Sequence, residues 1–185
     1  GSFWFLGFVV LLGVSASWEF SSLTRLPSNN ALRWFSLIAV TILIITGYQN
    51  GTDGASAVFP AIVIISLLIS LFHAQNPGHS WAWTLAGIIY VGVLLSYFVI
   101  LRNLPKGFTW LTFSVLTTWV SDSASYFVGR KFGRHLLWQK HSPKKTWEGA
   151  IGGVFVGTIA GAIISLWFLQ VPWPLAIILS CIVCL

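Results

Sequence analysis

Long apolar runs divide this sequence, and they limit the folds that are open to the chain. Six of the runs approach the roughly 20 residues that a membrane-spanning helix needs, and a seventh, Pro174–Leu185, is shorter. The pattern predicts an all-α protein, a polytopic transmembrane helix bundle with about six complete spans and a truncated seventh. We treat 1–185 as a single integral membrane domain. The expected complete spans are Phe3–Trp18, Leu32–Tyr48, Ala57–Phe72, Trp81–Leu101, Phe108–Val128 and Gly149–Leu169.

The amount and the sign of the charge narrow the class of partner. Only 8% of the residues are charged, against roughly 25% in a soluble domain. The formal net charge is +6, which favours anionic membrane lipids or an anionic substrate as partners. Because the basic residues lie beside apolar spans rather than on a soluble face, we expect no nucleic acid partner.

The positions of lysine and arginine predict how the chain is oriented in the membrane. The connections that share one side carry Arg25, Arg33 and a dense basic segment, whereas those on the other side carry only Arg102 and Lys106. Since cytoplasmic loops carry an excess of Lys and Arg, we expect a cytoplasmic basic loop at 129–148. Its basic residues are Arg130, Lys131, Arg134, Lys140, Lys144 and Lys145.

The fifth apolar run carries small and polar residues at three- and four-residue spacing, which places them on one helix face. We expect this face to turn toward the bundle interior, because lipid would leave its hydroxyl groups unpaired. A buried Asp122 would then need a cationic partner. It is either part of a structural pair or a carboxylate that positions metal or substrate. The residues of this face are Ser114, Thr118, Ser121, Asp122, Ser125 and Gly129.

A second polar segment, Ser142–Gly149, reads S-P-K-K-T-W-E-G. Ser142 suits the N-cap and the following proline suits the first helical position, so the pattern predicts a helix that starts here. Lys144 and Lys145 would lie in its first turn, within pairing distance of Glu148. Two lysines beside free N–H groups indicate a phosphate site. An ordinary membrane anchor of the positive-inside kind is the alternative for the lysines.

We interpret the glycines of the same region as packing residues and its histidines as surface residues. Four glycines from Gly149 to Gly161 follow one another at four-residue spacing, which predicts a strip for close helix contact. His135 and His141 lack a metal-ligand set around them, so we interpret both as surface residues.

Together, three segments of this region resemble the phosphatidate cytidylyltransferases, which are integral membrane CDP-diacylglycerol synthases. The resemblance implies a transferase that converts CTP and phosphatidic acid into CDP-diacylglycerol and pyrophosphate with Mg²⁺. Its segments are Asp122-Ser-Ala-Ser-Tyr126, Gly129-Arg-Lys-Phe-Gly133 and Ser142-Pro-Lys-Lys-Thr-Trp-Glu-Gly149, followed by Gly152-Gly153.

The same resemblance implies roles for individual residues. The two lysines would hold phosphates, the glutamate would orient the lysines, and the serine would present the helix start. The aspartate would help to hold metal or to order the polar cavity, while the tyrosine and the arginine would line the mouth of the site. The implied catalytic residues are Asp122, Lys144, Lys145 and Glu148, and the implied substrate-binding residues are Ser142, Tyr126 and Arg130.

The sequence departs from the family in one respect. The family has a C-terminal signature with a Lys-Asp pair, a P-G-H-G-G turn and an Asp-Arg segment, which supplies its principal metal-binding aspartates. Nothing after Gly153 resembles that signature. We therefore expect this chain to be a part of the enzyme that is inactive alone, with the main metal ligands beyond Leu185.

Two other functions remain open at this level. A CTP-dependent kinase of lipid alcohols such as polyprenol or phytol would use similar lysines, and activity with phosphatidic acid would exclude it. A non-catalytic membrane protein would keep the polar helix face without needing a nucleotide. A homodimer is also kept open as the oligomeric state.

Overall fold

The computed structural model describes residues 2–24, 31–138 and 142–185, and helices dominate them. The chain divides into two compact units, Gly1–Leu104 and Pro105–Leu185. The predicted all-α class is confirmed, apart from one short hairpin of strands. The prediction that 1–185 forms a single membrane domain stays a prediction.

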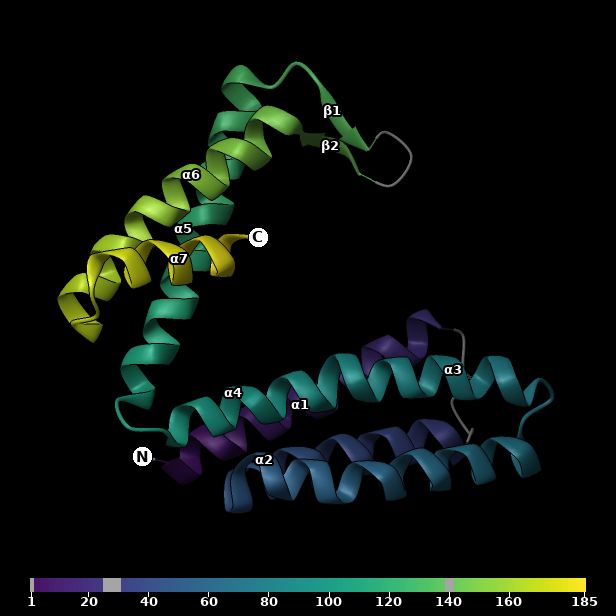
Figure 1. Ribbon diagram of the computed structural model, residues 1–185. Coiled ribbons are helices and arrows are strands. Elements are labelled where there is room, and N and C mark those ends of the chain that lie inside the picture. Colours follow the sequence, from purple (N-terminus) through teal and green to yellow (C-terminus); the bar gives the residue numbers. More distant parts are fainter. Residues whose placement is uncertain (1, 25–30, 139–141) are drawn as a thin grey trace. The chain divides into compact units, whose positions relative to one another are not determined.

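The first unit is built from helices alone within its described part. They are α1 (Ser2–Leu23), α2 (Ala31–His73), α3 (Pro77–Gly87), the π-helical segment η1 (Ile88–Val93) and α4 (Leu94–Asn103). The last three follow one another without interruption and make one long helical segment (Figure 1).

Helix α2 reverses direction at Gly51, so that its two arms, 31–50 and 52–73, lie side by side (Figure 1). Gly51 has φ 63° and ψ −145°, a combination that is open almost only to glycine. The arms meet through Leu43 and Ile62, which are buried in one apolar cluster. Each arm is long enough, at 1.5 Å per residue, to cover roughly 30 Å of hydrocarbon. The predicted second and third spans therefore correspond to the two arms of α2, which are separate helices joined at the non-helical Gly51.

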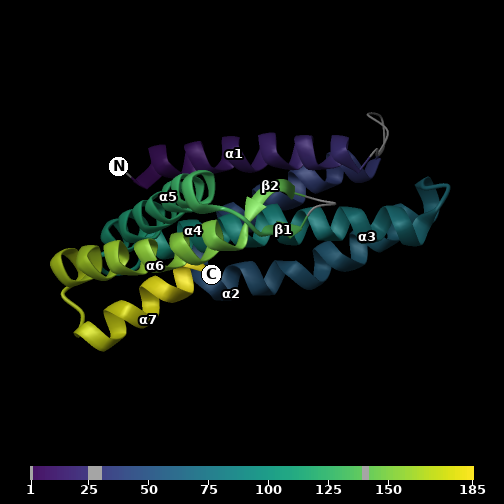
Figure 2. The same ribbon diagram turned by 90° about the horizontal axis from the view of Figure 1, so that it is seen from above.

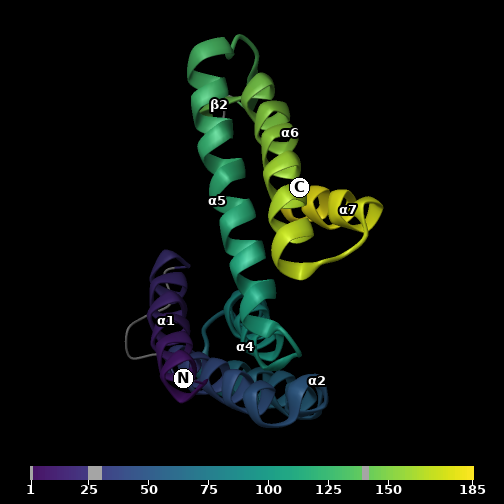
Figure 3. The same cartoon turned by 90° about the vertical axis from the view of Figure 1, so that its left-hand side faces the viewer.

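The second unit is a helical hairpin (Figure 3) with a small antiparallel β-hairpin at one end (Figure 1). Its long elements are antiparallel neighbours, and a shorter helix turns back from the second of them (Figure 2). The elements are α5 (Gly107–Phe132), β1 (Leu136–Trp138), β2 (Ser142–Thr146), α6 (Trp147–Ile164), the π-helical segment η2 (Ser165–Leu169) and α7 (Trp173–Cys184).

Glycines of α6 bring α5 and α6 into close contact, as their spacing predicts. All four are buried. A methyl group on Gly157 would lie 2.7 Å from the Cβ of Ser121, and one on Gly149 would lie 3.0 Å from the Cα of Gly129. Ser121 Oγ also donates a hydrogen bond to the carbonyl oxygen of Gly153, at 3.1 Å. We call this contact the small-residue seam; it pairs Thr117 with Gly161, Ser121 with Gly157, Ser125 with Gly153 and Gly129 with Gly149.

Apolar helices of spanning length confirm that the chain is an integral membrane protein. In the described residues, four helical segments are long and apolar enough to cross a membrane: Phe3–Leu23, Ala31–His73, Pro77–Asn103 and Trp147–Leu169. Helix α5 falls outside this set, and it carries Asp122, Arg130 and Lys131 along its length. The number of crossings stays a prediction.

Candidate functional site

Basic side chains gather where α5 ends, the β-hairpin turns and α6 begins. Helix α5 continues to Phe132, so the first part of the predicted loop 129–148 is helical and most of the rest is the hairpin. Residues 139–141, which include Lys140 and His141, lie outside the described part of the chain. The described basic residues at this end are all exposed, and an exposed cluster of one sign attracts anions. They are Arg130, Lys131, Arg134, Lys144 and Lys145.

The predicted helix start at Ser142 is wrong. Ser142 opens strand β2 and pairs with Trp138, while Leu136 pairs with Thr146. The N-cap of α6 is Thr146, whose side-chain oxygen accepts a hydrogen bond from the backbone N–H of Gly149 at 3.2 Å. Lys144 and Lys145 consequently lie on an exposed strand rather than in the first turn of a helix. A two-stranded ribbon tolerates a proline, because one of its edges needs no N–H donor.

The sequence suggested that Glu148 pairs with Lys144 or Lys145, but in the structure its partners are different. Its carboxylate accepts hydrogen bonds from the backbone N–H groups of Arg134, at 3.2 Å, and His135, at 3.2 and 3.3 Å. The Nδ1 atom of His135 lies 2.6 Å from the same carboxylate. Glu148 therefore joins the first turn of α6 to the segment that leaves α5. The expectation that Glu148 orients the lysines through direct contact is corrected accordingly.

The glycines of the Gly129–Gly133 segment make room for the cap of α6. A methyl group on Gly129 would lie 3.0 Å from Thr146 Oγ1, and one on Gly133 would lie 2.7 Å from Thr146 Cγ2. Both glycines thus let the end of α5 approach the start of α6. The motif has a packing role here, and it lacks the G-K-[ST] ending of a nucleotide-binding P-loop.

Asp122 is exposed on the surface of the second unit, contrary to the expected interior position. The helix face that packs against α6 is centred on Ser121 and Ser125, and a residue one step along a helix points about 100° away. Asp122 therefore lies beside the small-residue seam rather than within it. Among the described residues, no cationic partner of Asp122 is found.

Tyr126 and Arg130 continue the exposed face of α5 toward the basic end. They follow Asp122 at four-residue intervals, so the three side chains share one side of the helix. The guanidinium of Arg130 donates a hydrogen bond to the hydroxyl of Tyr126, at 3.2 Å. The structure thus places a carboxylate, a phenol and a guanidinium along one line that leads to the β-hairpin.

The described residues do not form a protein-built magnesium site. No group of three His, Cys, Asp or Glu side chains that could hold a metal occurs among them. Magnesium prefers octahedral oxygen ligands, usually one or two carboxylates together with substrate phosphates. In this unit the described carboxylates are Asp122 and Glu148, and Glu148 already accepts from His135 and from two backbone N–H groups.

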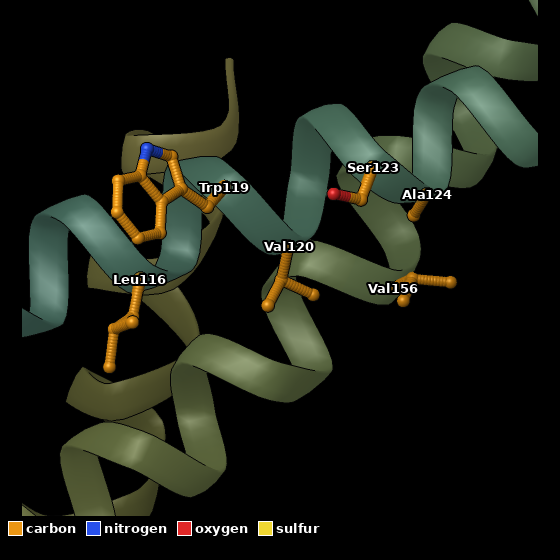
Figure 4. A pocket seen from close by; sticks show the side chains of 6 residues that line it. All are labelled: Leu116, Trp119, Val120, Ser123, Ala124 and Val156. Carbon is orange, nitrogen blue, oxygen red and sulfur yellow. The ribbon is translucent and has the colours of Figure 1, made fainter.

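An apolar groove of about 340 Å³ lies on the outer side of α5 and α6 (Figure 4). Figure 4 shows that α5 supplies most of its wall and that Val156 closes it from α6. It contains none of the predicted site residues, and a surface so poor in polar groups suits hydrocarbon rather than a nucleotide. The residues from α5 are Leu116, Trp119, Val120, Ser123 and Ala124.

Two residues of this region were missed at the level of sequence. Thr146 could have been found, because a threonine directly before an apolar run is a common N-cap. His135 carried no comparable pattern. Its partner Glu148 lies thirteen positions away, a spacing that no helix or strand period brings together.

These features define a class before any comparison: an α-helical integral membrane protein with an exposed basic hairpin suited to anionic groups. The chain belongs to the cytidylyltransferase family, because a model of that family matches residues 1–185. The resemblance drawn from the motifs is thereby confirmed.

Several relatives carry the name phosphatidate cytidylyltransferase. The protein of Bacillus subtilis is 38% identical over 127 residues, which cover 66% of this chain and 46% of the relative. That of Brucella suis is 29% identical over 166 residues, which cover 89% and 60%. That of Staphylococcus epidermidis is 33% identical over 154 residues, which cover 78% and 58%. The chain thus spans about half the length of these relatives.

Proposed function

We propose that the gene product containing this chain transfers a cytidylyl group from CTP to phosphatidic acid, which gives CDP-diacylglycerol and pyrophosphate. The observation that carries the proposal is the family match along the whole chain, together with relatives named for this reaction. The exposed basic hairpin supports it, because both substrates are anionic at the atoms that react.

In this reaction a phosphate oxygen of the lipid attacks the α-phosphorus of CTP. A new P–O bond forms as the bond to the pyrophosphate leaving group breaks. Catalysis of such a transfer is largely positioning and neutralisation of charge. We assign the phosphates of CTP to Lys144 and Lys145, which are exposed on β2. Arg130 and Tyr126 would line the approach to the site, and Ser142 would hold the start of the lysine strand.

Magnesium belongs to the proposal only through the resemblance. Asp122 is the one metal ligand that we assign from this chain, because its carboxylate is exposed and has no cationic partner among the described residues. When bound, the metal would neutralise phosphate charge. A homodimer is the oligomeric state that we propose.

We further propose six crossings of the membrane, with α7 as a short seventh apolar segment. Both arms of α2 would cross, because a single straight helix of 43 residues would be about twice as long as the hydrocarbon is thick. Helix α5 would cross beside α6, to which the small-residue seam joins it. The β-hairpin would face the cytoplasm, because the basic residues concentrate there.

Replacing the lysines tests the proposal. Lys144→Ala and Lys145→Ala should each lower kcat/KM for cytidylyl transfer. The corresponding loss of transition-state stabilisation should be a few kcal/mol, about that seen when a preorganised charge donor is removed. The control is Lys106→Ala, at the opposite end of α5. The measurement is release of pyrophosphate from CTP with phosphatidic acid in detergent micelles. Turnover by both variants within about threefold of the unsubstituted protein, a difference below ~1 kcal/mol, would return the lysines to the role of a membrane anchor.

A further inference from the structure

The base of the β-hairpin is closed by contacts that converge on one residue, His135. Its backbone N–H donates to the carboxylate of Glu148, and its carbonyl oxygen accepts from the backbone N–H of Trp147, at 3.0 Å. Its side chain reaches the same carboxylate. One residue thus connects the segment leaving α5 with the first two residues of α6.

The contact made by the imidazole differs from ordinary packing. The His135 side chain is 79% exposed, whereas that of Glu148 is 28% exposed. So exposed a ring buries little apolar surface, and its contribution must come from the polar contact itself. An ionised carboxylate only accepts hydrogen bonds, so Nδ1 carries the hydrogen in this pair. The 2.6 Å separation is that of a short, charge-assisted hydrogen bond.

The base of the hairpin determines where the two proposed phosphate-binding lysines lie. Lys145 directly precedes Thr146, which pairs with Leu136, the residue after His135. A movement of His135 would therefore reach the lysine strand through the pairing of Leu136 with Thr146. Among the described residues neither lysine forms an ion pair with a carboxylate, so this ribbon is what holds them.

We propose that His135 is a positioning residue, which through Glu148 holds the base of the hairpin and so keeps Lys144 and Lys145 in place for an anionic substrate. The inference rests on the proposed function for the identity of that substrate, CTP. We call the His135–Glu148 pair, together with the backbone hydrogen bonds donated by residues 134, 135 and 147, the clasp. The clasp is present whatever the substrate is. A positioning role predicts weaker nucleotide binding when the clasp opens, with the chemical step less affected.

Three variants of the gene product containing this chain test the clasp. His135→Ala removes the ring, and His135→Asn keeps an N–H donor at the same distance from the backbone as Nδ1. His73→Ala removes another exposed histidine, in α2 of the first unit. The first measurement is hydrogen exchange of the backbone amides of residues 134, 135 and 147 in detergent micelles without nucleotide. The second is KM for CTP and kcat.

An exposed polar contact of this kind contributes at most about fivefold to an equilibrium, and this sets the expected effects. His135→Ala should speed exchange at the three amides by about two- to fivefold and raise KM for CTP by a similar factor. Its kcat should stay within about twofold of the unsubstituted protein. His135→Asn should restore both values, and His73→Ala should change neither. A merely structural role would not give this split between KM and kcat.

The outcomes separate this inference from the proposed function. Unchanged exchange at all three amides in His135→Ala would overturn the clasp, whatever the protein catalyses. Faster exchange with an unchanged KM would overturn the positioning role. If the unsubstituted protein transfers no cytidylyl group, the proposed function fails, and the exchange experiment still decides the clasp.

Discussion

Replacing Gly157 by alanine should loosen the pairing of α5 with α6, because the added methyl group has no room. It would lie 2.7 Å from the Cβ and 3.1 Å from the Cα of Ser121, and 2.7 Å from the Sγ of Cys184. The Cα of Ser121 is part of the backbone of α5, so it cannot move aside as the end of a flexible side chain can. The helices must separate locally, and overpacking of this kind costs about 1–3 kcal/mol.

A matched substitution isolates that cost. Gly7 is exposed in α1, and a methyl group on it would meet nothing within 4 Å. Both Gly→Ala changes gain about 1 kcal/mol of helix propensity, so this gain cancels between them. The remaining difference of about 1–3 kcal/mol corresponds to a difference of about 2–12 °C in the apparent melting temperature of a chain of this size.

The assay is thermal unfolding in detergent micelles, followed by the loss of the folded peak on gel filtration. A second substitution, Ser121→Gly, removes the Cβ that Gly157→Ala would strike. In the double variant part of the loss should be recovered, with a coupling of about 0.5–3 kcal/mol. Equal melting temperatures for Gly157→Ala and Gly7→Ala would refute the close contact of the two helices at this point.

Three more substitutions or labels have defined outcomes. Gly51→Ala should destabilise the first unit by about 1–3 kcal/mol, because alanine resists this backbone conformation; Gly78→Ala, at an open position, is the control in the same melting assay. Thr146→Ala should cost about 0.5–2 kcal/mol through loss of the α6 cap, and Thr146→Ser should restore stability. Single cysteines at 130–145 should be labelled from the cytoplasmic side of sealed vesicles and those at 49–56 from the other side; the reverse pattern would overturn the proposed orientation.

The features that the sequence predicted well are those carried by one helix alone. The apolar runs became helices because length and hydropathy are properties of each run. The strip from Gly149 to Gly161 predicted a close helix contact without naming the partner, since glycine at four-residue spacing leaves a smooth helix face whatever the partner is, and the structure shows that the partner is α5. Gly51 lies between the predicted second and third spans, which is where α2 reverses direction.

The features that the sequence predicted poorly depend on two segments at once. The start of α6 was misplaced because a serine followed by proline suits both a helix start and a strand, and the pairing of β2 with β1 decides between them. Asp122 was placed in the interior because it neighbours Ser121 on a broad polar face. Helix α6 covers only one side of that face, and the sequence does not say which side.

The small-residue seam restricts how α5 and α6 can move past each other. Its small residues recur every fourth position on both helices. Displacement by four residues, about 6 Å along the axis, would set Gly157 against Ser125 and Gly161 against Ser121, again small beside small. A displacement by one or two residues would instead drive larger side chains into the contact. The seam therefore favours sliding in steps of about one turn, so that any movement of α6 along α5 would come as a discrete step and not as a continuous drift.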